Sequence, residues 1–214
     1  MSRLSRPRVL LADDHRLVAE GIKSLLSAEF DLVGVVEDGR ALLEAAKTLH
    51  PDVIVADITM PHLNGLDALA TLRKENSRVK VVFLTMHQEV PYARRALEGG
   101  ASGFVLKHSA PTELVAAIRA ALEGKTYLTP ALAGGVIEDL QRGHDAGATP
   151  KLTPRQREIL QLLAEGRSAK EIAATLGISS RTVEFHKYQM MESLHLHSSA
   201  ELIHFAIKQG IVGI

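Results

Sequence analysis

Four polar positions in the first half of the chain carry the side chains that phosphoryl chemistry requires. They are an acid pair at Asp13 and Asp14, a single acid at Asp57, a hydroxyl at Thr85 and an amine at Lys107. Carboxylates bind divalent cations such as Mg²⁺, and a carboxylate can also act as a nucleophile that accepts a phosphoryl group. An ammonium and a hydroxyl suit the oxygens of that group, since phosphoryl transfer depends on positioning and charge neutralisation. The set therefore predicts a site for a divalent cation and a phosphoryl group.

Each of these positions stands at the end of an apolar run that is typical of a buried parallel strand. The runs lie near residues 8–13, 32–36, 53–58, 79–86 and 103–107. Helical patterns lie between them, at residues 17–28, 41–49, 66–75, 90–98 and 112–122. The alternation predicts one doubly wound α/β sheet with helices on both faces and right-handed crossovers. Because the carboxyl ends of parallel strands share one edge, we expect the four positions to meet there.

Bulk composition narrows the class of protein. The chain has 214 residues, 46% of them hydrophobic, which is enough for one large or two small globular domains. It contains no Cys, which excludes disulfides, thiolate metal sites and cysteine catalysis. The first residues contain no apolar signal core, and no apolar run is long enough to span a membrane. We therefore expect a cytoplasmic protein with no membrane partner.

The second half of the chain differs in pattern. Residues 126–150 read as a linker, with a helix expected from Leu128 to Leu140 and then a polar, Gly-rich stretch. We place the domain boundary near residues 143–150. Residues 151–214 are expected to be all helical, because Thr153-Pro154 and Ser168 are typical helix starts.

Two of these helices, on either side of Gly177-Ile178-Ser179, fit a helix-turn-helix. The second helix, expected from Arg181 to Leu194, has an apolar stripe that includes Val183 and Met190. Its other face would enter the major groove of DNA. The candidate DNA-contacting residues are Arg181, Thr182, Glu184, Phe185, His186, Lys187 and Tyr188.

The charge of this region is modest for a DNA-binding domain. The whole chain has a formal net charge of zero, and residues 151–214 hold eight Lys and Arg residues against six acids. We therefore expect tight binding to need two copies. Glu184 has two readings that stay open, since it could accept from cytosine N4 or could simply be solvated.

With Met60-Pro61 and Gly65 following Asp57, residues 7–125 resemble the receiver domain of response regulators. Residues 151–214 resemble a LuxR-type helix-turn-helix domain. The combination resembles the NarL/FixJ family of two-component transcription regulators. This resemblance implies a five-stranded parallel sheet of order 2-1-3-4-5, followed by a small all-α domain of four helices.

The resemblance also implies roles for the strand-end residues. Asp57 would be the phosphoacceptor, and Thr85 and Lys107 would engage its phosphoryl group. Mg²⁺ would be held by the side chains of Asp13, Asp14 and Asp57 and by the backbone carbonyl of Thr59.

Phe104 would be a switch aromatic that follows Thr85. Packing alone predicts a half-buried aromatic there, and the missing hydroxyl excludes a hydrogen-bonded switched state. The implied partners are a sensor histidine kinase, double-stranded promoter DNA and RNA polymerase, with a homodimer forming on phosphorylation.

Two other functions fit the sequence less well. A phosphatase or mutase that uses an aspartyl phosphate usually needs a second acid two residues after the nucleophile, where this chain has Thr59. Such an enzyme would not explain the helical C-terminal region, so we expect no enzyme. A constitutive DNA binder would not need the complete set of acids, Thr85 and Lys107. His15, His87 and His108 lie near the same edge, but their spacing predicts no zinc site.

Overall fold

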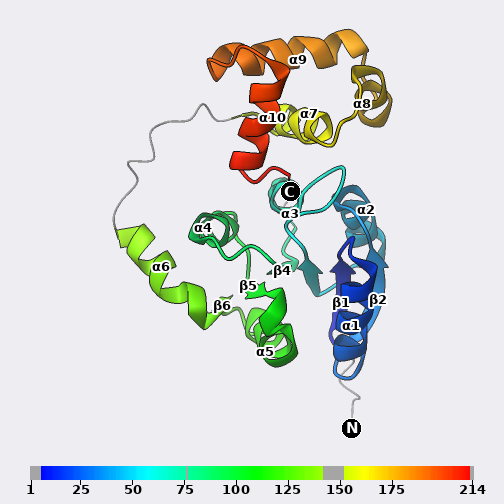
Figure 1. The fold of residues 1–214 in the computed structure, drawn as a ribbon. Helices are drawn as coiled ribbons and strands as arrows, with labels where there is room; N and C mark the ends of the chain where they lie inside the picture. Colours follow the sequence, from blue (N-terminus) through cyan, green and yellow to red (C-terminus); the bar gives the residue numbers. More distant parts are fainter. Residues whose placement is uncertain (1–5, 76, 142–151, 213–214) are drawn as a thin grey trace. The chain divides into compact units, whose positions relative to one another are not determined.

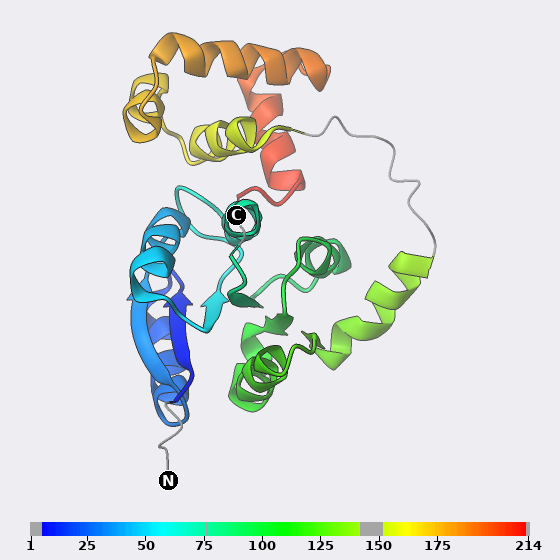
Figure 2. The same ribbon diagram turned by 180° about the vertical axis from the view of Figure 1, so that it is seen from behind.

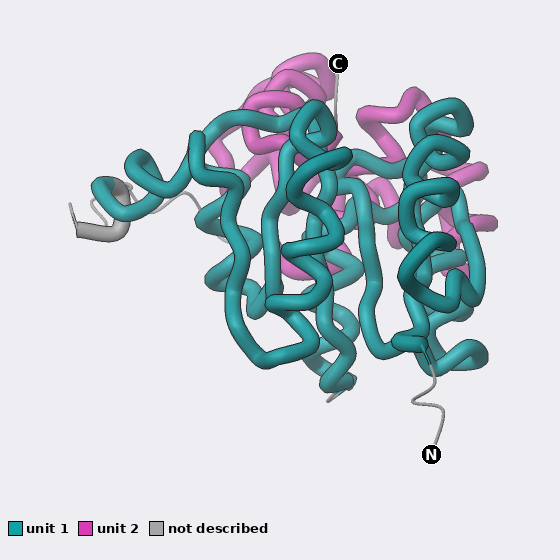
Figure 3. Tube along the Cα trace, turned by 90° about the horizontal axis from the view of Figure 1, so that it is seen from below, with its two compact units in different colours: residues 1–143 teal, residues 144–214 magenta. Residues whose placement is uncertain are grey.

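Two units make up the chain, residues 1–143 and residues 144–214 (Figure 3). The computed structural model describes residues 6–75, 77–141 and 152–212. The domain boundary expected near residues 143–150 lies outside the described residues. Each unit is therefore described by itself.

The first unit is built on a parallel sheet of six strands in the order β2-β1-β3-β4-β5-β6. Their bounds are β1 (Arg8–Ala12), β2 (Asp31–Val36), β3 (Val53–Ala56), β4 (Lys80–Thr85), β5 (Gly103–Leu106) and β6 (Tyr127–Leu128). The inner strands β1, β3, β4 and β5 are almost entirely buried, as expected for a sheet covered on both faces.

Helices cover both faces of the sheet (Figures 1 and 2). One core joins α1 (Arg16–Ser27) and α5 (Ala110–Leu122) to the side chains of one face. The core of the opposite face includes residues of four helices: α2 (Gly39–Leu49), α3 (Gly65–Lys74), α4 (Val90–Glu98) and α6 (Pro130–Gln141). A short 3-10 helix, η1 (Lys107–Ser109), leads from β5 into α5. The expected helices are present, with starts that differ by no more than two residues.

The sixth strand corrects the expected count of five. Tyr127 pairs with Gly103 and Leu128 with Phe104, so β6 extends the sheet beyond β5. Its two residues are too few to show a periodic pattern in the sequence. The pairing also satisfies backbone groups on the outer side of β5, because the N–H of Thr129 donates to the carbonyl of Phe104 at 3.0 Å. Helix α6 then starts at Pro130.

A glycine allows the helix after Asp57 to start beside that residue. A Cβ at Gly65 would lie 2.2 Å from the carbonyl oxygen of Asp57, so no larger residue fits there. Asn64 caps α3 by accepting from the N–H of Asp67 at 2.9 Å. The loop from Asp57 to α3 is therefore held close to the end of β3.

The second unit is all helical: α7 (Pro154–Ala164), α8 (Ala169–Leu176), α9 (Ser180–Ser193) and α10 (Ser199–Lys208). Thr153 and Ser168 each form a capping box at the start of α7 and α8. Gly177 closes α8 with a left-handed φ of 64°. Across the part of the chain that the structure describes, none of the helices has the length and apolar character needed to cross a bilayer.

Candidate functional site

Lys107 lies between two buried carboxylates at the carboxyl edge of the sheet. Its Nζ is 2.7 Å from Oδ2 of Asp57 and 2.8 Å from Oδ2 of Asp13, and the three side chains are at most 5% exposed. Asp13 follows β1, Asp57 follows β3 and Lys107 follows β5. The N–H of Asp57 donates to the carbonyl of Ala12 at 2.8 Å, which continues the sheet ladder to the site. Lys107 and Asp57, which are 50 positions apart in the sequence, therefore meet with Asp13 in one ion-paired group.

Burial and charge act against each other in this group. Burial raises the pKa of the Asp57 carboxyl, and the charge and hydrogen bond of Lys107 offset that rise only in part. Burial alone would lower the pKa of Lys107, but the charge of Asp57 and hydrogen bonds to both carboxylates raise it overall. The ammonium is therefore charged at neutral pH and supplies the positive charge between the two acids.

Asp14 and His15 extend this acidic group toward solvent. Ligand atoms of Asp13, Asp14, His15 and Asp57 all lie within 4.8 Å of one another. Nδ1 of His15 is 2.9 Å from Oδ1 of Asp14, whose side chain is 31% exposed. Mg²⁺ takes carboxylate oxygens and usually keeps several waters. Three carboxylates, one of them open to solvent, fit that ion.

Thr85 and Thr59 are joined through His87, a residue whose contacts the sequence did not reveal. Thr85 is fully buried at the end of β4, and its Oγ1 accepts from the backbone N–H of His87 at 3.2 Å. Nε2 of His87 is 2.8 Å from Oγ1 of Thr59, in the loop after Asp57. The same ring stacks on Tyr92 of α4, with centroids 4.1 Å apart and an interplanar angle of 15°. In the sequence, only the position of His87, two residues after Thr85, indicated that it could lie near the site.

Phe104 is fully buried, so the expectation of a half-buried aromatic was wrong. It pairs in register with Phe83 on β4 and packs in the core beneath α4 and α6. The full burial of Phe104 depends on β6 and α6, which cover the outer strand β5 and were not part of the expected five-stranded sheet.

Helix α9 presents two large aromatic side chains to solvent. Phe185 is 57% exposed and Tyr188 is 66% exposed, whereas Val183 and Met190 are fully buried in the core of the second unit. Exposed aromatic side chains on one face of a helix usually mark a contact surface. Arg181 is exposed near the start of the same helix.

Several polar groups of α9 have partners within the helix. Nζ of Lys187 is 3.4 Å from Oε2 of Glu184. Ser179 caps the helix by accepting from the N–H of Thr182 at 3.1 Å, and the two hydroxyl oxygens are 2.9 Å apart. The cap therefore uses the backbone N–H of Thr182. His186 is half-buried, with its ring edge-on to Phe185 at 5.9 Å.

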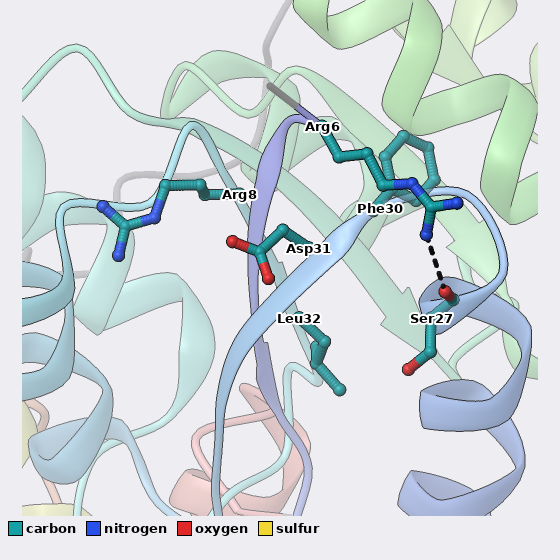
Figure 4. Close-up of a pocket in the computed structure, with 6 residues that line it drawn as sticks. All are labelled: Arg6, Arg8, Ser27, Phe30, Asp31 and Leu32. Carbon is teal, nitrogen blue, oxygen red and sulfur yellow. Dashed lines mark hydrogen bonds between the residues drawn. The ribbon is translucent and has the colours of Figure 1, made fainter. Parts of the chain in front are cut away.

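A separate pocket lies near the start of β1 and β2 (Figure 4). Its lining residues are Arg6, Arg8, Ser27, Phe30, Asp31 and Leu32. The two guanidinium groups point apart, and Arg6 donates to the backbone carbonyl of Ser27 at 3.4 Å. Because this pocket is at the amino end of β1, it is not part of the acidic site, which follows the carboxyl end of the same strand.

Comparisons with known proteins agree with this arrangement. The response regulator receiver domain family matches residues 9–119, and the luxR family of bacterial regulatory proteins matches residues 150–206. The transcriptional regulatory protein MctR of Rhizobium johnstonii is 37% identical over 214 residues, which cover 99% of this chain and 98% of MctR. The probable transcriptional regulatory protein NarL of Mycobacterium tuberculosis is 34% identical, over 96% of this chain and 95% of NarL.

A solved structure of two RcsB dimers bound to two parallel DNAs has a TM-score of 0.59 at 27% identity, and the match covers 94% of this chain and 98% of RcsB. The relatives are transcriptional regulators, a class of proteins that are not enzymes. The chain therefore belongs to the two-component response regulators of the NarL/FixJ family, which join a receiver domain to a LuxR-type DNA-binding domain.

Proposed function

We propose that a sensor histidine kinase phosphorylates Asp57 and that this phosphorylation controls binding of the protein to promoter DNA. The observation that carries the proposal is the buried bridge of Lys107 between Asp57 and Asp13, at 2.7 and 2.8 Å. Burying three charges costs desolvation free energy, so this group indicates a purpose other than stability. Phosphoryl transfer provides one, because a fixed ammonium beside a carboxylate neutralises the charge that the phosphoryl oxygens bring.

Each residue of the site has a defined task in this proposal. A carboxylate oxygen of Asp57 attacks phosphorus, the bond from phosphorus to the histidine nitrogen of the kinase breaks, and that nitrogen keeps the electron pair. Lys107 pairs with the phosphoryl oxygens, and the buried hydroxyl of Thr85 donates to them. Asp13, Asp14, Asp57 and the backbone carbonyl of Thr59 would hold Mg²⁺, which supplies further positive charge to those oxygens.

The DNA-binding part of the proposal rests on α9. Phe185 and Tyr188 are exposed on the face away from the core, where a major groove could receive them. Arg181, Thr182, Glu184, His186 and Lys187 are the polar residues proposed to contact bases or phosphates. The exposed charge of this unit is small, so we propose a phosphorylated homodimer that binds two half-sites. RcsB, a relative, has been solved as dimers on DNA.

We propose that the chemistry at Asp57 serves signalling in the cytoplasm, where bacterial promoters lie, and not the turnover of an external phosphomonoester. Recruitment of RNA polymerase by the bound dimer is the proposed output. Thr59 stands where an aspartyl-phosphate hydrolase would carry its second acid, which supports this assignment.

Acetyl phosphate and Mg²⁺ test the proposal directly. Intact mass spectrometry should show one added phosphoryl group on the wild type and none on Asp57→Asn, whereas the surface variant Asp31→Asn should be labelled like the wild type. Light scattering and DNA binding with beryllofluoride should show a gain in dimer and in DNA affinity that Asp57→Asn lacks. Labelling of Asp57→Asn, or an equal DNA affinity with and without beryllofluoride, would refute the proposed switch.

A further inference from the structure

Helix α6 packs against α4, the helix that begins directly after the Thr85 loop. Leu132 and Val136 of α6 are 6% and 2% exposed. They share a core with Ala93 and Ala96 of α4, both of which are fully buried. Helix α6 is also the last described element of the first unit before residues 142–151. Its position is therefore relevant to any signal that passes along the chain toward the second unit.

A close contact between the two helices depends on Gly135. A Cβ at this position would lie 2.7 Å from Cγ2 of Val90, the first residue of α4. Val is β-branched and stiff about χ1, so it cannot easily rotate away. The neighbouring Gly134 is different, because a Cβ there would meet nothing within 4 Å. Glycine within a helix is unfavourable, so the close contact with Val90 is the physical reason for Gly135.

The same first turn of α4 is connected to the phosphoacceptor edge. The ring of His87 stacks on Tyr92, and its Nε2 is 2.8 Å from Oγ1 of Thr59. The backbone N–H of His87 donates to the hydroxyl of Thr85. A change in the position of Thr85 or of the loop after Asp57 would therefore move His87. Through Tyr92, that movement reaches the turn of α4 on which Gly135 rests.

We propose that the contact between α6 and the first turn of α4 is a latch, closed in the unphosphorylated protein and weakened when Asp57 is phosphorylated. His87 is the positioning residue that joins the latch to the site. The inference rests on the proposed phosphorylation of Asp57. The latch adds to that proposal the element that responds to phosphorylation, helix α6, and the residues that connect it to the site.

Packing determines whether phosphorylation opens or closes the latch. When Thr85 donates to a phosphoryl group, the loop that carries His87 and leads into α4 at Val90 must adjust to it. A well-packed contact tolerates little displacement, so a shift of Val90 against the backbone of Gly135 opens the latch rather than deforming it. Coupling is reciprocal, so whatever opens the latch must also strengthen binding of a phosphoryl analogue at Asp57.

Hydrogen exchange of the full chain, measured on peptides from α6, tests the latch with a matched pair of variants. Beryllofluoride with Mg²⁺ should accelerate exchange in wild-type α6 about tenfold, a typical size for coupling between two sites. Gly135→Ala should accelerate exchange to a similar degree without beryllofluoride, relative to Gly134→Ala, which adds the same methyl group in open space. Gly135→Ala should also bind beryllofluoride several-fold more tightly than Gly134→Ala.

A second pair tests the route through His87. His87→Ala should accelerate exchange in α6, whereas His108→Ala, an exposed histidine at the same edge, should leave it unchanged. Equal exchange in these two variants, or in the two glycine variants, would overturn the latch.

The beryllofluoride experiment separates the two proposals. If the loop of residues 86–89 responds to beryllofluoride and α6 does not, the latch is wrong and the phosphorylation proposal stands. If neither segment responds, the phosphorylation proposal fails and the latch fails with it.

Discussion

Replacing Lys107 with methionine would remove the positive charge between Asp13 and Asp57 while keeping most of the side-chain volume. The Lys107 side chain is 5% exposed, and its ammonium pairs with both carboxylates within 2.8 Å. Breaking a buried ion pair on one side typically destabilises a protein by about 3–5 kcal/mol, because a charge is left buried without compensation. We expect a loss of about 3 kcal/mol at pH 8, at the low end because Asp57 can take up a proton.

The pH dependence of this loss has a definite sign. Burial already raises the pKa of Asp57, and removing Lys107 removes the two effects that lower it most. An acid with a raised pKa favours the folded state below its unfolded pKa, and this stability is lost as pH rises through the folded pKa. The pKa of Lys107 is raised, so in the wild type the bridge persists throughout neutral pH. The loss in Lys107→Met should therefore be larger at pH 8 than at pH 5.

Hydrogen exchange of β3 amides measures the opening free energy of the first unit in the intact chain. Lys125→Met is the matched control, because Lys125 pairs with Glu123 at 2.7 Å but is 71% exposed. An exposed pair contributes little, so this control should exchange like the wild type. Equal stability of Lys107→Met and wild type at pH 8, or a loss that shrinks with rising pH, would refute the reasoning.

Three further outcomes are expected. Mg²⁺ at ten times its dissociation constant should stabilise the first unit by about 1.4 kcal/mol, measured by thermal unfolding. Asp14→Asn should reduce this stabilisation by Mg²⁺. The absence of any stabilisation of the wild type by Mg²⁺ would argue against a metal site. Phe185→Ala should weaken binding to a cognate promoter about tenfold with no change in melting temperature, because the ring is 57% exposed. A drop in melting temperature for this variant would instead place the ring in the core. Lys187→Ala should lower the slope of log affinity against log salt concentration by about one. His50→Gly should stabilise the first unit by about 0.5 kcal/mol in urea unfolding, because His50 caps the end of α2 with a left-handed φ of 44°, which glycine adopts without strain. Destabilisation would mean that contacts of the His50 side chain outweigh this backbone strain.

The positions of the acidic edge could be predicted because they depend on simple rules. Asp13, Asp57 and Lys107 each follow a strand that the apolar pattern reveals, and parallel strands bring their carboxyl ends to one edge. The order of the inner strands followed from the family resemblance. These inferences needed neither side-chain packing nor the details of loops.

The contacts of His87 could not be predicted in the same way. Its hydrogen bond to Thr59 and its stack on Tyr92 depend on how a loop folds back against a neighbouring loop and a helix. The strand β6 was missed for a related reason, because two residues show no period and gain their order from pairing with β5. At the start of α9, the N–H of Thr182 comes before the regular helical hydrogen bonds begin, and it donates to the side chain of Ser179.

The capping boxes at Thr153 and Ser168 are also expected to speed the folding of the second unit. In each box the two partners are three residues apart, so the start of α7 and of α8 is encoded within a single turn. Contacts between near neighbours close without long loops, and helical domains built from them fold fast. The parallel sheet of the first unit requires a crossover for each adjacent pair, which is intrinsically slower. The receiver domain is synthesised first, yet the C-terminal helices are expected to reach their native state in less time once their own residues have been released from the ribosome.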